Sequence, residues 1–160
     1  MIVLGIDPGS RRTGWGVVRH QGNETAHIAS GVLALGGSRP LPERLVTLAE
    51  ELSRVVAEHR PEACAIERIF SAKNAHSALV LGHARGVALC EVARLGVPLF
   101  EYTPTQVKQA VAGTGGAKKS QVGRMVQMLL GHQQPLAEDA ADALALALTH
   151  AAASRLAQLG

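Results

Sequence analysis

The chain begins with MIVLGIDPG (residues 1–9), and TGWGVVR (residues 13–19) follows after a short interval. Met1–Ile6 is an apolar run that ends at Asp-Pro-Gly, which is typical of a strand entering a turn. Residues 13–19 alternate as expected of the returning strand of a hairpin, and Ala26–Leu35 predicts a third strand that ends at Gly36-Gly37. These strands predict an antiparallel meander at the start of the fold.

Strand and helix patterns alternate beyond the meander. Apolar residues recur at helical spacing from Leu45 to Val56, and this helix is expected to end before Pro61. Three meander strands followed by strand–helix units predict an α/β fold in one domain, with a mixed sheet flanked by helices. The further elements we expect are strands Ala63–Ile69 and Leu99–Tyr102, and helices Asn74–Leu95, Pro104–Val111, Ser120–Leu130 and Leu136–Leu156.

The composition of the 160 residues is that of a globular protein. Apolar residues make up 47% and charged residues 18%, which excludes a disordered chain. No apolar run is long enough for a membrane span and no secretory signal is present, so the cytoplasm is the expected compartment. Cys64 and Cys90 lack the spacing of a zinc site or a disulfide framework.

Basic residues are segregated along the chain, although the net charge is only +3. No acid lies between Glu67 and Glu91, where Lys and Arg contribute +3, or between Glu101 and Glu138, where they contribute +4. Such segregation suits a polyanionic partner, with chance clustering in a small chain as the alternative. The basic residues of the two stretches are Arg68, Lys73, Arg85, Lys108, Lys118, Lys119 and Arg124.

Four acids occupy positions suited to chemistry, although each has a simpler explanation. Asp7 suits the Asp-Pro-Gly turn by itself, and Glu67, on a largely buried strand, could pair with an arginine. Asp139 and Asp142 lie on one face of the last predicted helix, near the end where acids favour the helix dipole. Together the four offer only oxygen donors, which favours Mg²⁺ or Mn²⁺ and two-metal phosphodiester cleavage.

The order of elements along the chain resembles the ribonuclease H-like nuclease fold. A strand that ends in an acid is followed by the rest of the meander, by a second strand that ends in an acid, and by a late helix with Asp-x-x-Asp. More narrowly, motifs along nearly the whole chain resemble those of the RuvC-type Holliday junction resolvases. These motifs are GIDPGS (5–10), AIE (65–67) with Phe70, AKN (72–74), SAL (77–79), LG (81–82), ARG (84–86), QVKQ (106–109), KSQV (119–122) and DAADALA (139–145).

The resemblance implies a single nuclease domain over residues 1–160 that nicks four-way DNA junctions symmetrically. It also implies a preference for a short T-rich sequence, and 5′-phosphate and 3′-hydroxyl ends. Asp7, Glu67, Asp139 and Asp142 are the implied ligands of two Mg²⁺ ions, with Mn²⁺ as the alternative, and Lys119 is a further implied catalytic residue. The implied partners are the RuvA and RuvB branch-migration proteins.

Basic side chains and one phenylalanine are the predicted DNA contacts. The resemblance favours phosphate contacts for Lys108 and Lys119, whereas Lys118 and Arg124 could instead lie on a solvated helix face. Phe70, just beyond the second strand acid, could stack on a base or join the core. The predicted DNA-binding set is Phe70, Lys73, Arg85, Lys108, Lys118 and Arg124.

The predicted helix Asn74–Leu95 carries Ala78, Gly82, Gly86 and Cys90 in one i, i+4 row. Glycine inside a helix is unfavourable by up to about 1 kcal/mol relative to alanine, which close approach of a neighbour would offset. That neighbour could be the chain's own sheet or the same helix of a second copy. We favour a homodimer, because two symmetric nicks need two active sites.

Two other functions fit part of the pattern. An actin-like ATPase or sugar kinase shares the fold and the Asp-x-Gly turn, but such enzymes use two lobes. A DNA-binding module without catalysis would use the basic stretches and leave the acids idle. Cutting of a junction that depends on metal separates both alternatives from a nuclease.

Overall fold

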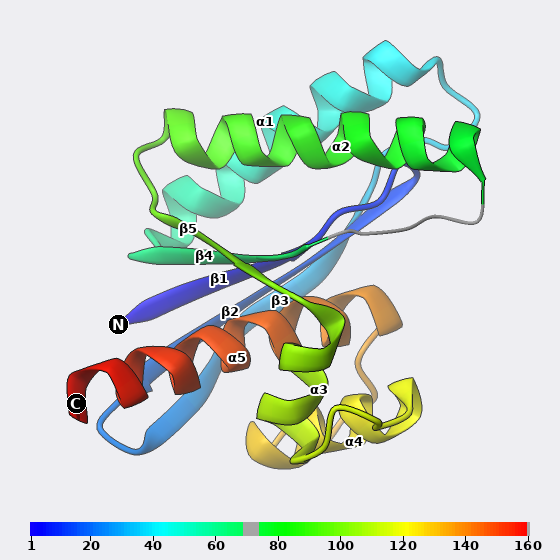
Figure 1. The fold of residues 1–160 in the computed structure, drawn as a ribbon. Coiled ribbons are helices and arrows are strands. Elements are labelled where there is room, and N and C mark those ends of the chain that lie inside the picture. Colours follow the sequence, from blue (N-terminus) through cyan, green and yellow to red (C-terminus); the bar gives the residue numbers. More distant parts are fainter. Residues whose placement is uncertain (69–73, 160) are drawn as a thin grey trace.

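The structure, a computed structural model, describes residues 1–68 and 74–159. Strands and helices follow one another along the chain in the predicted order (Figure 1). The strands are β1 (Ile2–Asp7), β2 (Arg12–Gln21), β3 (Glu24–Ala34), β4 (Ala63–Glu67) and β5 (Leu99–Tyr102). The helices are α1 (Leu41–His59), α2 (Ala75–Arg94), α3 (Pro104–Ala112), α4 (Lys119–Leu129) and α5 (Glu138–Leu159).

The strands form one mixed sheet in the order β3-β2-β1-β4-β5. β1 pairs antiparallel with β2, and β2 with β3, which confirms the predicted meander. β1 also pairs parallel with β4, with Ile6 opposite Ile66, and β4 pairs parallel with β5. Because β1 and β4 run in the same direction, their last residues, Asp7 and Glu67, lie at the same edge of the sheet.

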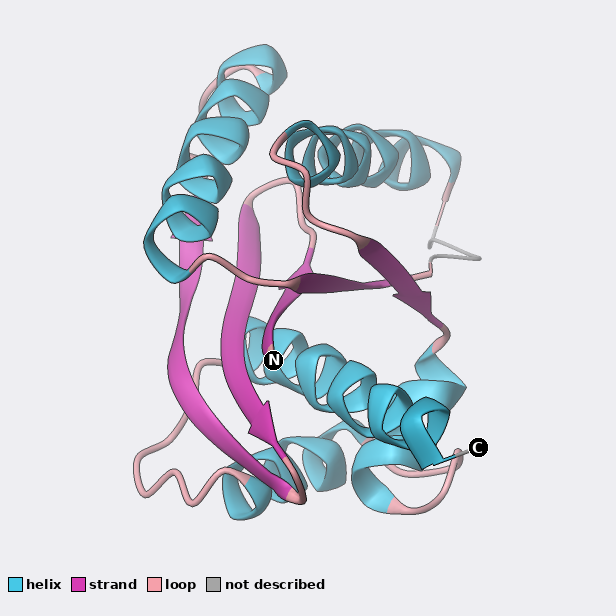
Figure 2. Ribbon diagram, turned by 90° about the vertical axis from the view of Figure 1, so that its left-hand side faces the viewer, coloured by secondary structure: helices cyan, strands magenta, loops and turns pink. Residues whose placement is uncertain are grey.

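Helices cover both faces of the sheet (Figure 1, Figure 2). α1 and α2 pack on one face, where Leu4 and Ile6 of β1 belong to their apolar cluster. α5 crosses the other face beside α3 and α4, and Val3 of β1 belongs to this second cluster. The alternation of side chains along β1 therefore supplies both cores.

α5 lies very close to the sheet because glycines face it. A Cβ on Gly5 would lie 1.8 Å from the carbonyl oxygen of Ala143, and one on Gly16 would lie 2.5 Å from Cγ of Leu144. Glycine inside a strand often marks such a close approach. These contacts hold the first turns of α5 against β1 and β2.

The predicted elements differ from the observed ones mainly at their ends. α1 begins at Leu41 rather than Leu45, because a proline in the first turn has no N–H that needs an intrahelical partner. β4 ends at Glu67 rather than at residue 69, and residues 69–73 lie outside the described residues. Over the residues that are described, no helix is long and apolar enough to cross a membrane.

Candidate active site

Asp7 and Glu67 end two neighbouring parallel strands. The residues before them, Ile6 and Ile66, are partners in the register of β1 and β4. Both acidic side chains are partly buried at this edge of the sheet. The carboxyl ends of parallel strands are a common place for ligand-binding side chains in open α/β sheets.

α5 brings two more acids to the same edge. Asp139 and Asp142 lie near its first residue, and carboxylate oxygens of Asp7, Asp139 and Asp142 lie within 4.8 Å of one another. One divalent cation could contact all three, because hard cations take oxygen ligands at about 2.0–2.6 Å. Glu67 is outside this group of three but lines the same pocket as Asp7 and Asp142.

The acids of this site repel one another. The pKa of Asp7 is raised to about 7, first by burial and then by the negative charges of Asp142, Glu67 and Asp139. Burial also raises the pKa of Glu67 and that of Asp142. Partly buried carboxylates in this arrangement favour either a proton or a bound cation. The donor set therefore fits a divalent metal ion.

Two basic side chains reach the acids of α5 from different elements. Nζ of Lys119, at the start of α4, lies 2.8 Å from Oδ2 of Asp142 and 2.6 Å from Oε1 of Glu138. Burial lowers the pKa of Lys119, but hydrogen bonds to Asp142 and Glu138 outweigh this and raise it. Nε of Arg12, the first residue of β2, lies 3.5 Å from Oδ2 of Asp139.

Sequence reasoning missed Arg12 and Glu138 as members of this site. Glu138 directly precedes Asp139, so its place in the first turn of the last helix was a usable signal. Arg12 gave no such signal, because it reaches Asp139 only through the packing of α5 across β2.

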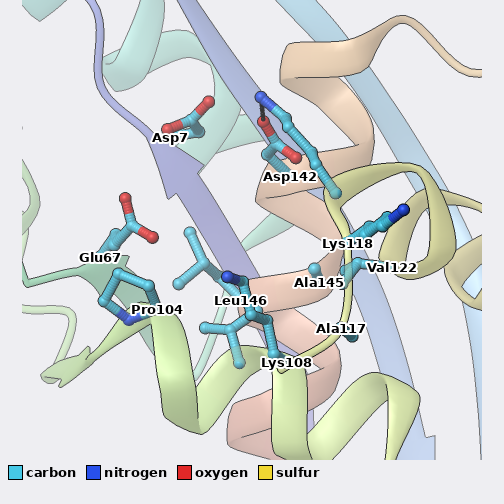
Figure 3. A pocket seen from close by; sticks show the side chains of 12 residues that line it. Asp7, Glu67, Pro104, Lys108, Ala117, Lys118, Val122, Asp142, Ala145 and Leu146 are labelled. Carbon is cyan, nitrogen blue, oxygen red and sulfur yellow. Dashed lines mark ion pairs between the residues drawn. The ribbon is translucent and has the colours of Figure 1, made fainter. Parts of the chain in front are cut away.

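A pocket of about 550 Å³ opens beside the acids. In Figure 3, Asp7, Glu67 and Asp142 surround one part of it, Lys108 extends from α3 toward these acids, and Lys118 points away from them. The pocket therefore combines acidic and basic side chains, which suits a phosphate group held together with cations. Its lining residues are Asp7, Glu67, Pro104, Val107, Lys108, Ala117, Lys118, Lys119, Val122, Asp142, Ala145 and Leu146.

Arg85, a predicted DNA contact, has partners within the protein. Its guanidinium forms an ion pair with Glu101 of β5, and its Nε donates to the backbone oxygen of Glu67 at a distance of 3.2 Å. This arginine therefore ties α2 to the ends of β4 and β5. Glu101 directly precedes the second acid-free stretch of the sequence. The ion pair places this acid beside Arg85, which belongs to the first acid-free stretch.

A family model and curated relatives of this chain agree on one family. The family model described as crossover junction endodeoxyribonuclease RuvC matches residues 3–150. The chain belongs to this RuvC family. The RuvC of Citrifermentans bemidjiense is 50% identical over 151 residues, which cover 94% of this chain and 92% of that protein.

Solved RuvC structures have the same fold. The Thermus thermophilus RuvC structure matches with a TM-score of 0.90 and 38% identity, over 98% of this chain and 97% of that one. A second structure, T. thermophilus RuvC in complex with Holliday junction substrate, matches with a TM-score of 0.92 and 38% identity over 98% and 96%. The predicted ribonuclease H-like fold, with its antiparallel meander and parallel strands, is confirmed.

Of the other predicted DNA contacts of this RuvC family member, two lie within the described residues. Lys118 precedes α4 and lines the pocket, whereas Arg124 lies exposed on α4, with its Nε 3.4 Å from the backbone oxygen of Ser120. Phe70 and Lys73 fall outside the described residues.

The row of small residues on α2 faces outward. A Cβ on Gly82 or Gly86 would have no atom of the described residues within 4 Å, apart from the backbone of its own helix turn, and Ala78 and Cys90 are exposed. The alternative in which this row packs against the chain's own sheet is therefore wrong, because Ala84, Ala88 and Val92 occupy that face of the helix instead. Leu79, 65% exposed, lies beside the row in a shallow groove between α1 and α2.

Proposed function

We propose that this protein resolves Holliday junctions in DNA recombination and repair by two symmetric nicks. One observation carries the proposal. Asp7, Asp139 and Asp142 meet within 4.8 Å in a chain whose fold matches, over 98% of its length, a RuvC solved with Holliday junction substrate. The proposed products carry 5′-phosphate and 3′-hydroxyl ends, and the preferred cutting site is a short T-rich sequence.

Mg²⁺ is the proposed cofactor, with two ions in each site and Mn²⁺ as the alternative. Carboxylate oxygens are the ligands that these hard cations prefer. Burial and the neighbouring acids raise the pKa of Asp7, and bound cations would offset both effects. When bound, such ions lower the pKa of the attacking water and stabilise the leaving oxygen. Asp7, Glu67, Asp139 and Asp142 would hold them.

The lysines of the pocket would position the DNA backbone. Lys119 lies against Asp142, so its ammonium group could contact a phosphate held over the acids. Lys108 and Lys118 line the same pocket and would contact flanking phosphates. Arg124, farther along α4, would contact the backbone outside the pocket.

A homodimer would supply the second active site. The outward row of Ala78, Gly82 and Gly86 allows a helix of a second copy to approach α2 closely. Exposed Leu79 offers apolar surface at the same place. We therefore propose α2 as the two-fold contact.

The setting of this activity follows from the proposed substrate. Residues 1–160 would act as one nuclease domain in the cytoplasm, where chromosomal DNA is available. RuvA and RuvB, which move the branch point, are the proposed protein partners.

The test is cleavage of a mobile four-way junction and of linear duplex, with Mg²⁺ and with a chelator. We expect paired nicks in the junction with Mg²⁺, little cutting of the duplex, and intact but bound junction in the chelator. Binding without cutting under all conditions would instead favour a DNA-binding module without catalysis. ATP turnover without DNA cleavage would favour the ATPase alternative.

A further inference from the structure

The acids of α5 are each paired with a cation that belongs to the protein. Lys119 pairs with Asp142 from α4, and Arg12 pairs with Asp139 from β2. Asp139 is one of the three carboxylates close enough to share a metal ion. Arg12 is therefore paired with a carboxylate that a metal ion would use.

We propose that Arg12 is an exchangeable counter-ion of Asp139. A DNA phosphate becomes the new partner of Arg12, and a metal ion takes the place of Arg12 beside Asp139. This inference rests on the proposed nuclease function, and it adds a positioning residue that couples DNA binding to metal binding. Junction DNA would offer Arg12 a phosphate partner, and the freed Asp139 would then bind the metal ion more tightly.

The geometry makes the Arg12 pair easy to exchange. The side chain of Arg12 is 70% exposed, and its shortest approach to Asp139 is 3.5 Å, from Nε to Oδ2. Lys119, by contrast, contacts two acids at 2.6 and 2.8 Å. An exposed ion pair shifts an equilibrium by only about two- to fivefold, so a phosphate can compete with it.

Asp139 itself is held in place while Arg12 can move. A Cβ on Gly14 would lie 1.9 Å from the backbone oxygen of Asp139, so the first turn of α5 is seated directly on β2. Only the arginine side chain has to reorient when the partner changes. The metal site is therefore preformed in position, and its charge is balanced by the protein until DNA arrives.

Arg11 provides a matched control in the same turn. It is also exposed, but its side chain lies along Gly37, where a Cβ would be 3.3 Å from Cδ of Arg11. Within the residues that the structure covers, Arg11 forms no ion pair with an acid. Removing it changes the local charge by the same amount without freeing Asp139.

The experiment measures Mn²⁺ binding by electron paramagnetic resonance, with the free protein and with an immobile junction that the wild type binds but does not cut. We expect Arg12→Ala to lower the Kd for Mn²⁺ about two- to fivefold in the free protein and to leave it unchanged in the complex. In the wild type, the Kd for Mn²⁺ should differ between the free protein and the complex. Arg12→Lys should keep most of this difference, and Arg11→Ala should keep all of it. By linkage, Mn²⁺ should tighten junction binding less in Arg12→Ala than in the wild type.

Two results would overturn the inference while the nuclease function stands. One is an unchanged Kd for Mn²⁺ in free Arg12→Ala, and the other is an equal change in the free protein and in the complex. A wild type that fails to bind junctions, or to cut a mobile junction with Mg²⁺, would instead remove the proposed function and the inference with it. That failure is visible before any variant is made.

Discussion

The backbone oxygen of Asp139 occupies the space that a side chain at Gly14 would need. A Cβ on Gly14 would lie 1.9 Å from this oxygen, and Gly14 is the partner of Asp7 in the register of β1 and β2. The helix acid is thus seated directly beside the strand acid. Because glycine has no side chain, residue 14 allows the carboxylates of Asp7 and Asp139 to approach each other closely.

Gly14→Ala should therefore push α5 away from the sheet and open the group of acids. We expect a loss of about 1–3 kcal/mol in the free energy of unfolding, as for other overpacked sites, and a loss of cleavage of at least about tenfold. Thermal unfolding and a junction-cutting assay measure the two effects. Gly123→Ala, in α4 with open space around it, is the control and should stabilise by about 0.5–1 kcal/mol. Wild-type cutting by Gly14→Ala would show that the close seating is not needed.

Asp7→Asn, Glu67→Gln and Asp142→Asn should each reduce cleavage by at least about a hundredfold, because metal ions supply several kcal/mol of transition-state stabilisation. Junction binding in a chelator should be largely retained, since the lysines of the pocket remain. Glu50→Gln, an exposed acid on α1, is the control and should cut normally. Equal loss of junction affinity in all three variants would indicate misfolding, and the assignment of the acids would then be wrong.

The sequence predicts that two of the acids lie at strand ends, because short apolar runs are readable along the chain. Met1–Ile6 and Ala63–Ile66 are short apolar runs that end in an acid, and parallel pairing brings such ends together. Ion pairs are not readable in the same way. Arg12 meets Asp139, and Arg85 meets Glu101, only through tertiary packing, so local patterns carry no information about either pair.

The raised pKa of Asp7 predicts how the metal-free protein responds to pH. Its folded pKa, about 7, lies above the ordinary value of 3.8, so between these values the folded protein holds a proton that the unfolded chain has lost. The contribution of Asp7 to stability therefore falls as the pH rises from about 4 to about 7. Chemical unfolding in chelator at several pH values, compared between wild type and Asp7→Asn, isolates this contribution. The difference in slope should vanish with saturating Mg²⁺, and identical slopes in chelator would contradict the raised pKa.

Lys119→Ala should weaken junction binding and reduce its salt dependence. Loss of one phosphate contact lowers the slope of log K against log salt by about 0.9. Titrations of labelled junction at several salt concentrations measure the slope, and Arg54→Ala on α1, paired there with Glu51, is the control. An unchanged slope would mean that Lys119 stays with Asp142 and Glu138 when DNA binds.

Ala78→Glu should weaken the proposed dimer, because it places a charge in the outward row of α2, where the two copies would meet. The substitution leaves the fold intact, since Ala78 is exposed in the first turn of the helix, a position where an acid suits the helix dipole. Ala152→Glu, at an exposed position of α5 on the other side of the sheet, is the matched control. Sedimentation velocity should show a shift toward monomer for Ala78→Glu alone. Nicking of the two strands should then lose its coordination, while each remaining nick still depends on Mg²⁺. Wild-type sedimentation by Ala78→Glu would place the two-fold contact on another surface.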